Sequence, residues 1–289
     1  MPAGLGASAV RAALVQKRAT SAVIFVPPLL VVLVLGMPWI LLGLALLAAF
    51  AAVECLRLLD SAGHPSLTLL GIVLAVTLTV EAGAPADLAD KAALLLAVGL
   101  VLAAVGAFGR RDPRDGVATW IGTVFGALYV GQLGFVARLG IVAPALPAGA
   151  PLAAIGSDRG WIALLVLAVW AFDTGAYLIG RRFGKERFLT HISPSKTYAG
   201  LIGGIASATV VIGLVLWGLG RSPVEALILG PLISLTAQAG DLAESMLKRA
   251  AAAKDSGSLI PGHGGLLDRV DSFLFAAPIL TLYVLAVVR

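Results

Sequence analysis

The segment KDSGSLIPGHGGLLDRVDS, residues 254–272, gathers carboxylates, cations and glycines between two apolar stretches. Its Asp268 and Asp271 lie three residues apart, so a helix that starts near residue 266 would point both carboxylates the same way. The preceding glycines would let the backbone approach a polyphosphate, and the helix N-terminus would add its dipole. The pattern therefore indicates a metal-phosphate site rather than the acid pair of a glycosidase.

A second set of polar residues precedes this loop in QAGDLAESMLKRA, residues 238–250. If one helix continues through it, Gln238, Asp241, Ser245 and Lys248 share a face. This face would aim Asp241 into a bundle of helices and Lys248 toward its mouth. The carboxylates of both segments are therefore expected to meet at one boundary of the membrane.

Such a set of side chains suits phosphoryl-type transfer. Mg²⁺ takes one or two carboxylates together with substrate phosphates and water, and a pair of metals can bridge the attacking and leaving oxygens. We expect Asp241, Asp268 and Asp271 to bind one or two Mg²⁺ ions, with Lys and Arg side chains neutralising phosphate charge. A solvated loop with internally paired charges would not explain Asp241, which belongs to an otherwise apolar helix.

Each of three further polar residues could have either a functional or a structural role. Asp173 lies inside a predicted span, where a carboxylate costs about 2.5 kcal/mol or more unless it is paired or hydrated; we favour a functional role over simple helix orientation. His263 is either a phosphate contact or proton carrier, or a residue that only caps the loop. Glu54, near the end of a predicted span, either joins the site or extends toward the lipid headgroups.

The composition predicts an all-α, polytopic membrane bundle. The chain has 289 residues, of which 59% are hydrophobic and 13% charged, and its mean hydropathy is +0.99. A soluble domain carries about 25% charged residues. Because a span needs about 20 apolar residues, apolar runs with no more than two charged residues each predict nine transmembrane helices. These runs lie near residues 21–36, 38–53, 65–80, 92–109, 116–137, 161–180, 199–219, 223–243 and 272–288.

The number of spans is linked to their orientation. The junction Gly36-Met37-Pro38 either separates the first two spans or kinks a single longer one, which would leave eight. Nine spans put 16 Lys and Arg residues on one side and 5 on the other, whereas eight spans give 13 and 8. The positive-inside rule therefore favours nine, with the N-terminus in the cytoplasm. The net charge of +5 then reflects topology and anionic headgroups, so no nucleic acid partner is expected.

This topology divides the chain into three parts. Residues 1–20 form a cytoplasmic amphipathic N-terminus, and residues 21–160 hold five spans and an outward loop. Residues 161–289 form the catalytic region, with four spans and cytoplasmic loops at 181–198 and 244–271. The apolar run from 21 to 53 is too long for a signal peptide, so we expect a retained anchor in the inner membrane.

Residues 245–272, SMLKRAAAAKDSGSLIPGHGGLLDRVDS, resemble the C-terminal signature of the phosphatidate cytidylyltransferase family. That signature reads S-x-x-K-R-x4-K-D and, after a spacer, H-G-G-x-x-D-R-x-D, and every fixed position is matched. The segments QAGDL and D-x-x-A-Y-x-x-G, the latter starting at Asp173, are also similar to the family. The family's S-P-K-K-T-x-E-G is SPSKTYAG here, so Ser195 replaces a lysine and Ala199 a glutamate.

The resemblance implies that the phosphate of phosphatidic acid attacks the α-phosphorus of CTP, yielding CDP-diacylglycerol and pyrophosphate with Mg²⁺ required. It implies catalytic roles for Asp241, Asp268, Asp271 and Lys248, with the three aspartates as metal ligands. The implied substrate-binding residues are Asp173, Ser193, Lys196, Arg249, Lys254, His263, Gly264, Gly265 and Arg269.

The expected partners are CTP, phosphatidic acid and the bilayer, and a homodimer is a candidate assembly. The lipid is expected to enter through an opening between helices near Asp173 and Asp241. Two other functions compete with this one. A CTP-dependent lipid kinase would transfer the γ-phosphoryl group and release CDP. An ion-coupled secondary transporter would bind its ions at Asp173 and Asp241, but it gives no reason for the H-G-G-x-x-D-R loop.

Overall fold

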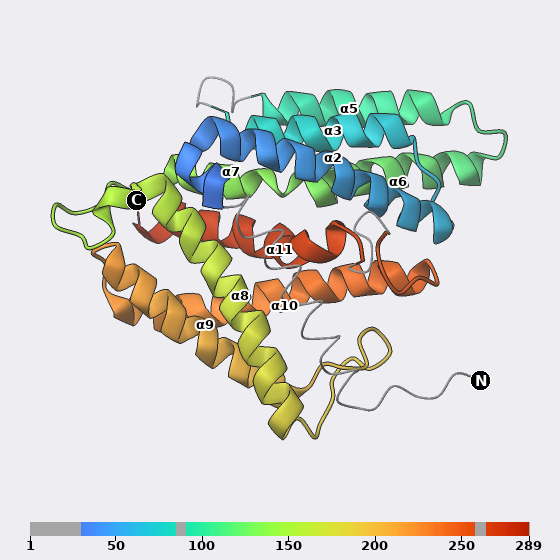
Figure 1. Ribbon diagram of the computed structural model, residues 1–289. Helices are drawn as coiled ribbons and strands as arrows, with labels where there is room; N and C mark the ends of the chain where they lie inside the picture. The colour runs from blue at the N-terminus through green and yellow to red at the C-terminus, as the bar shows by residue number, and fades with distance from the viewer. Residues whose placement is uncertain (1–29, 85–90, 258–263, 289) are drawn as a thin grey trace, which may run out of the picture.

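A computed structural model describes residues 30–84, 91–257 and 264–288 of the chain (Figure 1). Throughout these ranges the regular structure is helical, apart from an isolated antiparallel bridge between Arg187 and Thr197. The predicted all-α class is therefore confirmed. Gly36, at φ 91°, interrupts the helix between residues 30–35 and the next helical segment, as the Gly-Met-Pro junction suggested.

The N-terminal half forms one group of helices, drawn in blue, cyan and green in Figure 1. It contains α2 (Met37–Ser61), α3 (Thr68–Ala82), α5 (Ala92–Ala107), α6 (Pro113–Gly131) and α7 (Gly134–Val142). α2 packs against α3 and α6, and α5 packs against α3 and α6. Small residues in α2, including Ala48, Ala51 and Ala52, are fully buried in this core.

The C-terminal half forms a second group, preceded by the short turn η1 (Ala153–Ile155). It contains α8 (Ser157–Phe183), α9 (Tyr198–Gly218), η2 (Pro223–Glu225), α10 (Ala226–Ala250) and α11 (Leu267–Tyr283), which ends in the π-helical turn η3 (Val284–Val288). α8 and α9 approach closely because glycines face neighbouring side chains: a Cβ at Gly175 would overlap Ser207, and one at Gly204 would overlap Phe172.

α11 joins the two groups. It packs mainly on α10 and also contacts α2, α7 and α8. Its residues Leu267, Val270 and Leu274 belong to the core around α2, whereas Ala276, Ala277 and Leu280 belong to the core around α8. The first turn of α11 is therefore fixed from both halves of the chain.

Six helical segments of the described residues are long and apolar enough to cross a bilayer. They are Met37–Ser61, Pro113–Val142, Ser157–Phe183, Tyr198–Gly218, Pro223–Ala250 and Leu267–Val288. The predicted spans near 65–80 and 92–109 correspond to the shorter apolar helices Thr68–Ala82 and Ala93–Ala107. The first predicted span and the N-terminal segment 1–20 lie largely or wholly outside the described residues.

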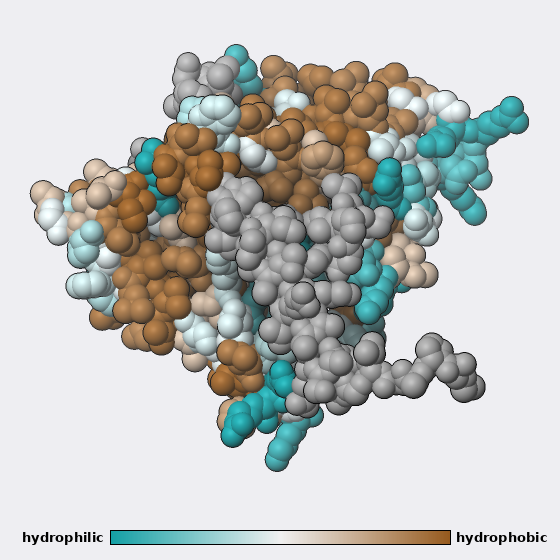
Figure 2. All heavy atoms as spheres, in the orientation of Figure 1, coloured by the Kyte–Doolittle hydropathy of each residue, from teal (hydrophilic) through white to brown (hydrophobic). Residues whose placement is uncertain are grey.

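The surface agrees with a multi-pass membrane protein. Large apolar side chains such as Leu69, Ile202 and Leu214 are more than 60% exposed on the flanks of their helices. Figure 2 shows hydrophobic residues over much of the visible helical surface and hydrophilic ones near its periphery. An apolar surface of this extent would be a liability in water and suits contact with lipid.

Candidate active site

α10 carries the first group of polar residues. The helix runs without interruption from Ala226 to Ala250, which confirms that QAGDLAESMLKRA is helical. Gln238 donates a hydrogen bond from Nε2 to Oδ2 of Asp241 over 3.3 Å. Glu244 lies three residues beyond Asp241 and four before Lys248, and Lys248 Nζ is 2.8 Å from Glu244 Oε2. One side of α10 therefore presents two carboxylates and a lysine in sequence.

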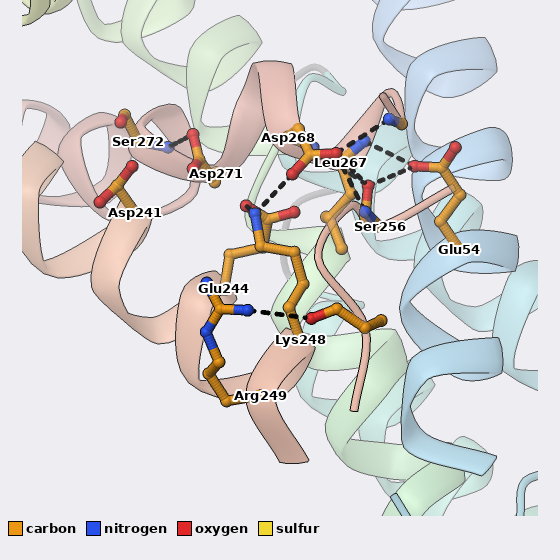
Figure 3. A network of polar contacts seen from close by, with 12 residues as sticks. Glu54, Asp241, Glu244, Lys248, Arg249, Ser256, Leu267, Asp268, Asp271 and Ser272 are labelled. Carbon is orange, nitrogen blue, oxygen red and sulfur yellow. Dashed lines mark hydrogen bonds and ion pairs between the residues drawn. The ribbon is translucent and has the colours of Figure 1, made fainter. Parts of the chain in front are cut away.

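α11 brings its aspartates to this side of α10. A Cβ added at Gly240 would overlap the backbone carbonyl of Asp271, so the glycine permits the close approach of the two helices. Asp271 is 8% exposed, and its Oδ1 accepts a hydrogen bond of 2.6 Å from the Ser272 backbone N–H. Its electrostatic neighbours include Asp241 and Glu244, and Figure 3 shows the Asp241 and Asp271 carboxylates side by side.

Lys248 lies between two carboxylates. Its Nζ is 2.5 Å from Asp268 Oδ1 as well as 2.8 Å from Glu244 Oε2, and its side chain is only 12% exposed. In this arrangement the ammonium group neutralises buried acids and joins α10 to α11. A phosphate contact by Lys248 would have to share the ammonium with these two partners.

Asp268 is the most completely hydrogen-bonded of the three predicted metal ligands. Its Oδ2 accepts from the backbone N–H groups of Ser256 (3.0 Å) and Gly265 (2.8 Å) and from the Ser256 hydroxyl (2.9 Å), while Oδ1 accepts from Lys248. Because each carboxylate oxygen has about two lone-pair directions, Oδ2 is saturated and only Oδ1 keeps a free direction. Asp268 thus organises the polypeptide around it.

The loop before α9 supplies a second lysine. Thr197 caps α9 by accepting a hydrogen bond from the Gly200 N–H (3.1 Å), as hydroxyl residues do at helix starts. The cap fixes the preceding residue, Lys196, whose Nζ lies 3.0 Å from Asp241 Oδ2. Asp173 of α8 has Lys196 and Asp241 as electrostatic neighbours, and its side chain is exposed on the helix surface.

The other predicted substrate-binding residues surround this core. Arg249 donates from Nε to the Ile192 carbonyl (3.3 Å), so it ties the loop before α9 to the end of α10. Ser193 is buried in that loop, whereas Lys254 and Arg269 are exposed. Gly264 has φ 79°, a conformation that favours glycine, and a Cβ at Gly265 would overlap Ser256 and Glu54. His263 lies outside the described residues.

Four polar residues of this region were missed or left undecided by the sequence analysis. Glu244 was overlooked, although its position between Asp241 and Lys248 on the helix gave a signal. Glu54 and Tyr129 reach the region from the distant helices α2 and α6, so spacing along the chain could not place them there. Ser256 lies in the segment 254–272 itself, but its spacing gave no signal. Tyr129 of α6 has Asp241, Glu244 and Asp271 among its electrostatic neighbours.

The donor set fits a divalent cation completed by substrate oxygens. The described residues contain no preassembled group of three or more His, Cys, Asp or Glu side chains with metal-binding geometry. Glu244 Oε1 and the Tyr129 hydroxyl are nevertheless buried without a hydrogen-bond partner, beside the Asp241–Asp271 pair. Adjacent carboxylates repel one another unless one is protonated or a cation lies between them, and Mg²⁺ commonly takes one or two of them plus phosphate oxygens.

Fold and site together define a polytopic membrane protein with an acidic, lysine-lined site where α10 and α11 meet. A family model described as "Cytidylyltransferase family" matches residues 16–287, and the chain belongs to this family.

Three relatives are named phosphatidate cytidylyltransferase. The one from Synechocystis sp. is 45% identical over 124 residues, 42% of either chain. The one from Staphylococcus saprophyticus is 40% identical over 136 residues, 44% of this chain and 50% of the relative. The one from Brucella suis is 46% identical over 124 residues, 42% of this chain and 46% of the relative. The matched region thus spans half or less of each relative's length.

Proposed function

We propose that this protein is a phosphatidate cytidylyltransferase, which converts CTP and phosphatidic acid to CDP-diacylglycerol and pyrophosphate. The observation that carries the proposal is the meeting of Asp241 and Asp271 beside Lys196 and Lys248 at one end of α10. Acids and cations so arranged can hold a metal-nucleotide and balance its charge. The shared name of the relatives and the family match support the same reaction.

The reaction is an in-line displacement at phosphorus. A phosphate oxygen of phosphatidic acid forms a bond to the α-phosphorus of CTP, and the bond from that phosphorus to the bridging oxygen of pyrophosphate breaks. Because the lipid phosphate is already anionic, it needs no strong general base. The main demands are therefore positioning and neutralisation of phosphate charge.

The residues divide these demands among them. Asp241 and Asp271 would hold Mg²⁺, one ion or two, and the metal when bound would neutralise the phosphates of CTP. Lys196, already 3.0 Å from Asp241, is suited to contact a phosphate of the bound nucleotide. Arg249 and Lys254, both exposed near the end of α10, are suited to the outgoing pyrophosphate. Asp268 holds Lys248 and the chain before α11 in place.

Asp173 is suited to the entry of the lipid. It is exposed on α8 although it lies ten residues before the end of a membrane-spanning helix. A carboxylate in that position needs a polar neighbour or water, and Lys196 and Asp241 are its neighbours. We propose that α8 and α10 separate near Asp173 to admit the phosphatidic acid headgroup from the bilayer.

The topology is part of the same proposal. Nine spans with a cytoplasmic N-terminus would put the basic loops at 110–114 and 181–198 and the site on the cytoplasmic side of the inner membrane, where CTP is dissolved. α3 has 15 residues and rises about 22 Å, so it would cross a bilayer core of about 30 Å only where the membrane is thin. A homodimer remains the candidate assembly, and nucleic acid is not among the proposed partners.

The test uses the purified full-length chain with phosphatidic acid, Mg²⁺ and CTP labelled at the α-phosphorus. The proposed reaction transfers label to the lipid phase and releases one pyrophosphate for each lipid labelled. A CTP-dependent lipid kinase would leave the label in CDP, and a transporter would leave CTP unchanged. Either result would overturn the assignment.

A further inference from the structure

Glu54 links the N-terminal group of helices to the proposed site. It lies on α2, more than 180 residues before the aspartates of α11, and its side chain is only 2% exposed. Its Oε2 accepts a hydrogen bond from the Leu267 backbone N–H over 2.8 Å and lies 3.0 Å from the Ser256 hydroxyl. Glu54 therefore contacts the connection between α10 and α11 at Ser256 and the first residue of α11, Leu267.

Ser256 lies between two carboxylates. Its hydroxyl is 3.0 Å from Glu54 Oε2 and 2.9 Å from Asp268 Oδ2, and a hydroxyl has one proton to donate. The Ser256 backbone N–H also donates to Asp268 (3.0 Å). The contacts thus run without interruption from Glu54 through Ser256 to Asp268 and then to Lys248 (Figure 3). We call Glu54 and Ser256 the α2 bridge.

The backbone around the α2 bridge is fitted to the Glu54 carboxylate. A Cβ added at Gly257 would overlap Glu54 Oε1, and one added at Gly265 would overlap both Glu54 and Ser256. Glycines at these two positions let the chain pass directly against the acid. Burying a carboxylate is costly unless its partners compensate. Oε2 has the Leu267 N–H and a share of the Ser256 hydroxyl, whereas Oε1 is buried without a hydrogen-bond partner.

We propose that Glu54 is a positioning residue that holds Asp268 and Lys248 in their working geometry, so that the N-terminal helices contribute to the reaction. This inference rests on the proposed function. Groups that orient the residues next to a reacting centre typically alter activity by about 10- to 100-fold. Glu54 acts through Ser256 and the start of α11, so its removal is expected to disturb Lys248 most. Lys196 and Arg249 should be disturbed less, because they contact Asp241 and the Ile192 carbonyl instead.

The experiment compares four variants of the full-length protein in detergent. Glu54→Ala removes the acceptor, whereas Glu54→Gln keeps an oxygen that can accept from Leu267 and Ser256. Ser256→Ala removes the bridging hydroxyl alone. Asp60→Ala is the matched control, because Asp60 lies on the same helix but is exposed. Each variant is measured for kcat and for KM toward CTP, for melting temperature, and for hydrogen exchange in peptides covering 264–270 and 200–215.

The expected result is a selective loss. Glu54→Ala should lower kcat by about 10- to 100-fold with KM for CTP changed less than about threefold, and Glu54→Gln should recover most of that loss. Amide exchange should accelerate in 264–270, where the Leu267 N–H loses its acceptor, and stay unchanged in 200–215. Ser256→Ala should shift kcat and exchange in the same direction, and Asp60→Ala should shift neither.

The proposal is overturned if Glu54→Ala keeps kcat within about twofold, or if exchange rises equally in both peptides, since general loosening would then explain the loss. Should Glu54→Ala fail to fold, Glu54→Gln and Ser256→Ala decide the question through the same measurements. If the wild-type protein transfers no cytidylyl group, the proposed function fails by itself. The exchange data still establish or refute the α2 bridge in that case.

Discussion

Asp268 and the pair Asp241–Asp271 come from the same polar segments but have opposite surroundings. Asp268 receives three hydrogen bonds from the Lys248 ammonium and the backbone N–H groups of Ser256 and Gly265, and it shares the Ser256 hydroxyl with Glu54. Asp271 receives one from Ser272 and has other acids as neighbours, and Asp241 is bound by Lys196 and Gln238 while 30% exposed. Asp268 is thus held mainly by donors of the protein, whereas Asp241 and Asp271 have fewer such donors and are the pair that we propose binds the cation.

The largest predicted effect concerns the pair. Asp271→Asn should lower cytidylyl transfer by roughly 1000-fold, because a ligand to the metal that neutralises the phosphates is lost. The melting temperature without Mg²⁺ should stay the same or rise, since one of several adjacent negative charges disappears. Transfer of label to lipid and thermal unfolding with and without Mg²⁺ test both parts. A clear fall in melting temperature would mean that Asp271, like Asp268, mainly stabilises the fold.

Asp268→Asn should affect activity less and stability more. The amide can accept fewer charge-assisted hydrogen bonds, so we expect a loss of about 2 kcal/mol in the free energy of unfolding and a roughly 10- to 100-fold fall in kcat. Denaturant titration in detergent together with the transfer assay measures the two effects. An unchanged stability would contradict the organising role.

A third prediction distinguishes the binding of CTP from the proposed metal binding by Asp241 and Asp271. Lys196→Ala removes the cation that lies 3.0 Å from Asp241, and it should raise KM for CTP by about tenfold, the equivalent of one charge-assisted hydrogen bond. Because the Lys196–Asp241 ion pair is partly exposed, its loss should lower the free energy of unfolding by no more than about 1 kcal/mol. A change confined to kcat would argue that Lys196 acts on the transition state rather than on binding.

The smallest effect is expected at Lys185. This exposed residue lies on the same loop as Lys196, but we attribute its charge to topology and headgroup contact. Lys185→Ala should therefore keep kcat and KM within about twofold of the wild-type values. Assayed beside Lys196→Ala, it controls for the loss of one positive charge from this loop. A loss as large as that of Lys196→Ala would mean that the loop acts through its total charge.

Much of this division was predictable from residue types, and part of it was not. The helical face of α10 and the start of α11 follow from apolar periodicity, so the approach of Asp241 and Asp271 could be foreseen. The saturation of Asp268 could not, because its partners Ser256 and Gly265 belong to a loop whose path has no periodic signal. The role of Glu54 depends on α2 packing against α11, a contact between distant parts of the sequence that no local spacing encodes.

The lengths of the helices were predicted less well than their existence. The predicted span near 223–243 stopped before Glu244 and Lys248, but α10 continues to Ala250, in line with the helical face expected over 238–250, because these two residues pair at helical spacing. α11 begins at Leu267, close to the helix start expected near residue 266 and before the apolar run near 272–288, and Asp268 is held there by donors from the preceding segment. The charged residues that seemed to end the spans are those that build the site.

The position of α11 has a consequence for biosynthesis. Chains are made from the N-terminus, so α2 and α10 are complete while residues 267–288 have yet to emerge from the ribosome. Until they do, Lys248 has only Glu244 as an ion-pair partner, and Glu54 has no Leu267 amide to accept from. A nascent chain therefore has no assembled acidic centre, and the proposed activity would require α11 to be in place.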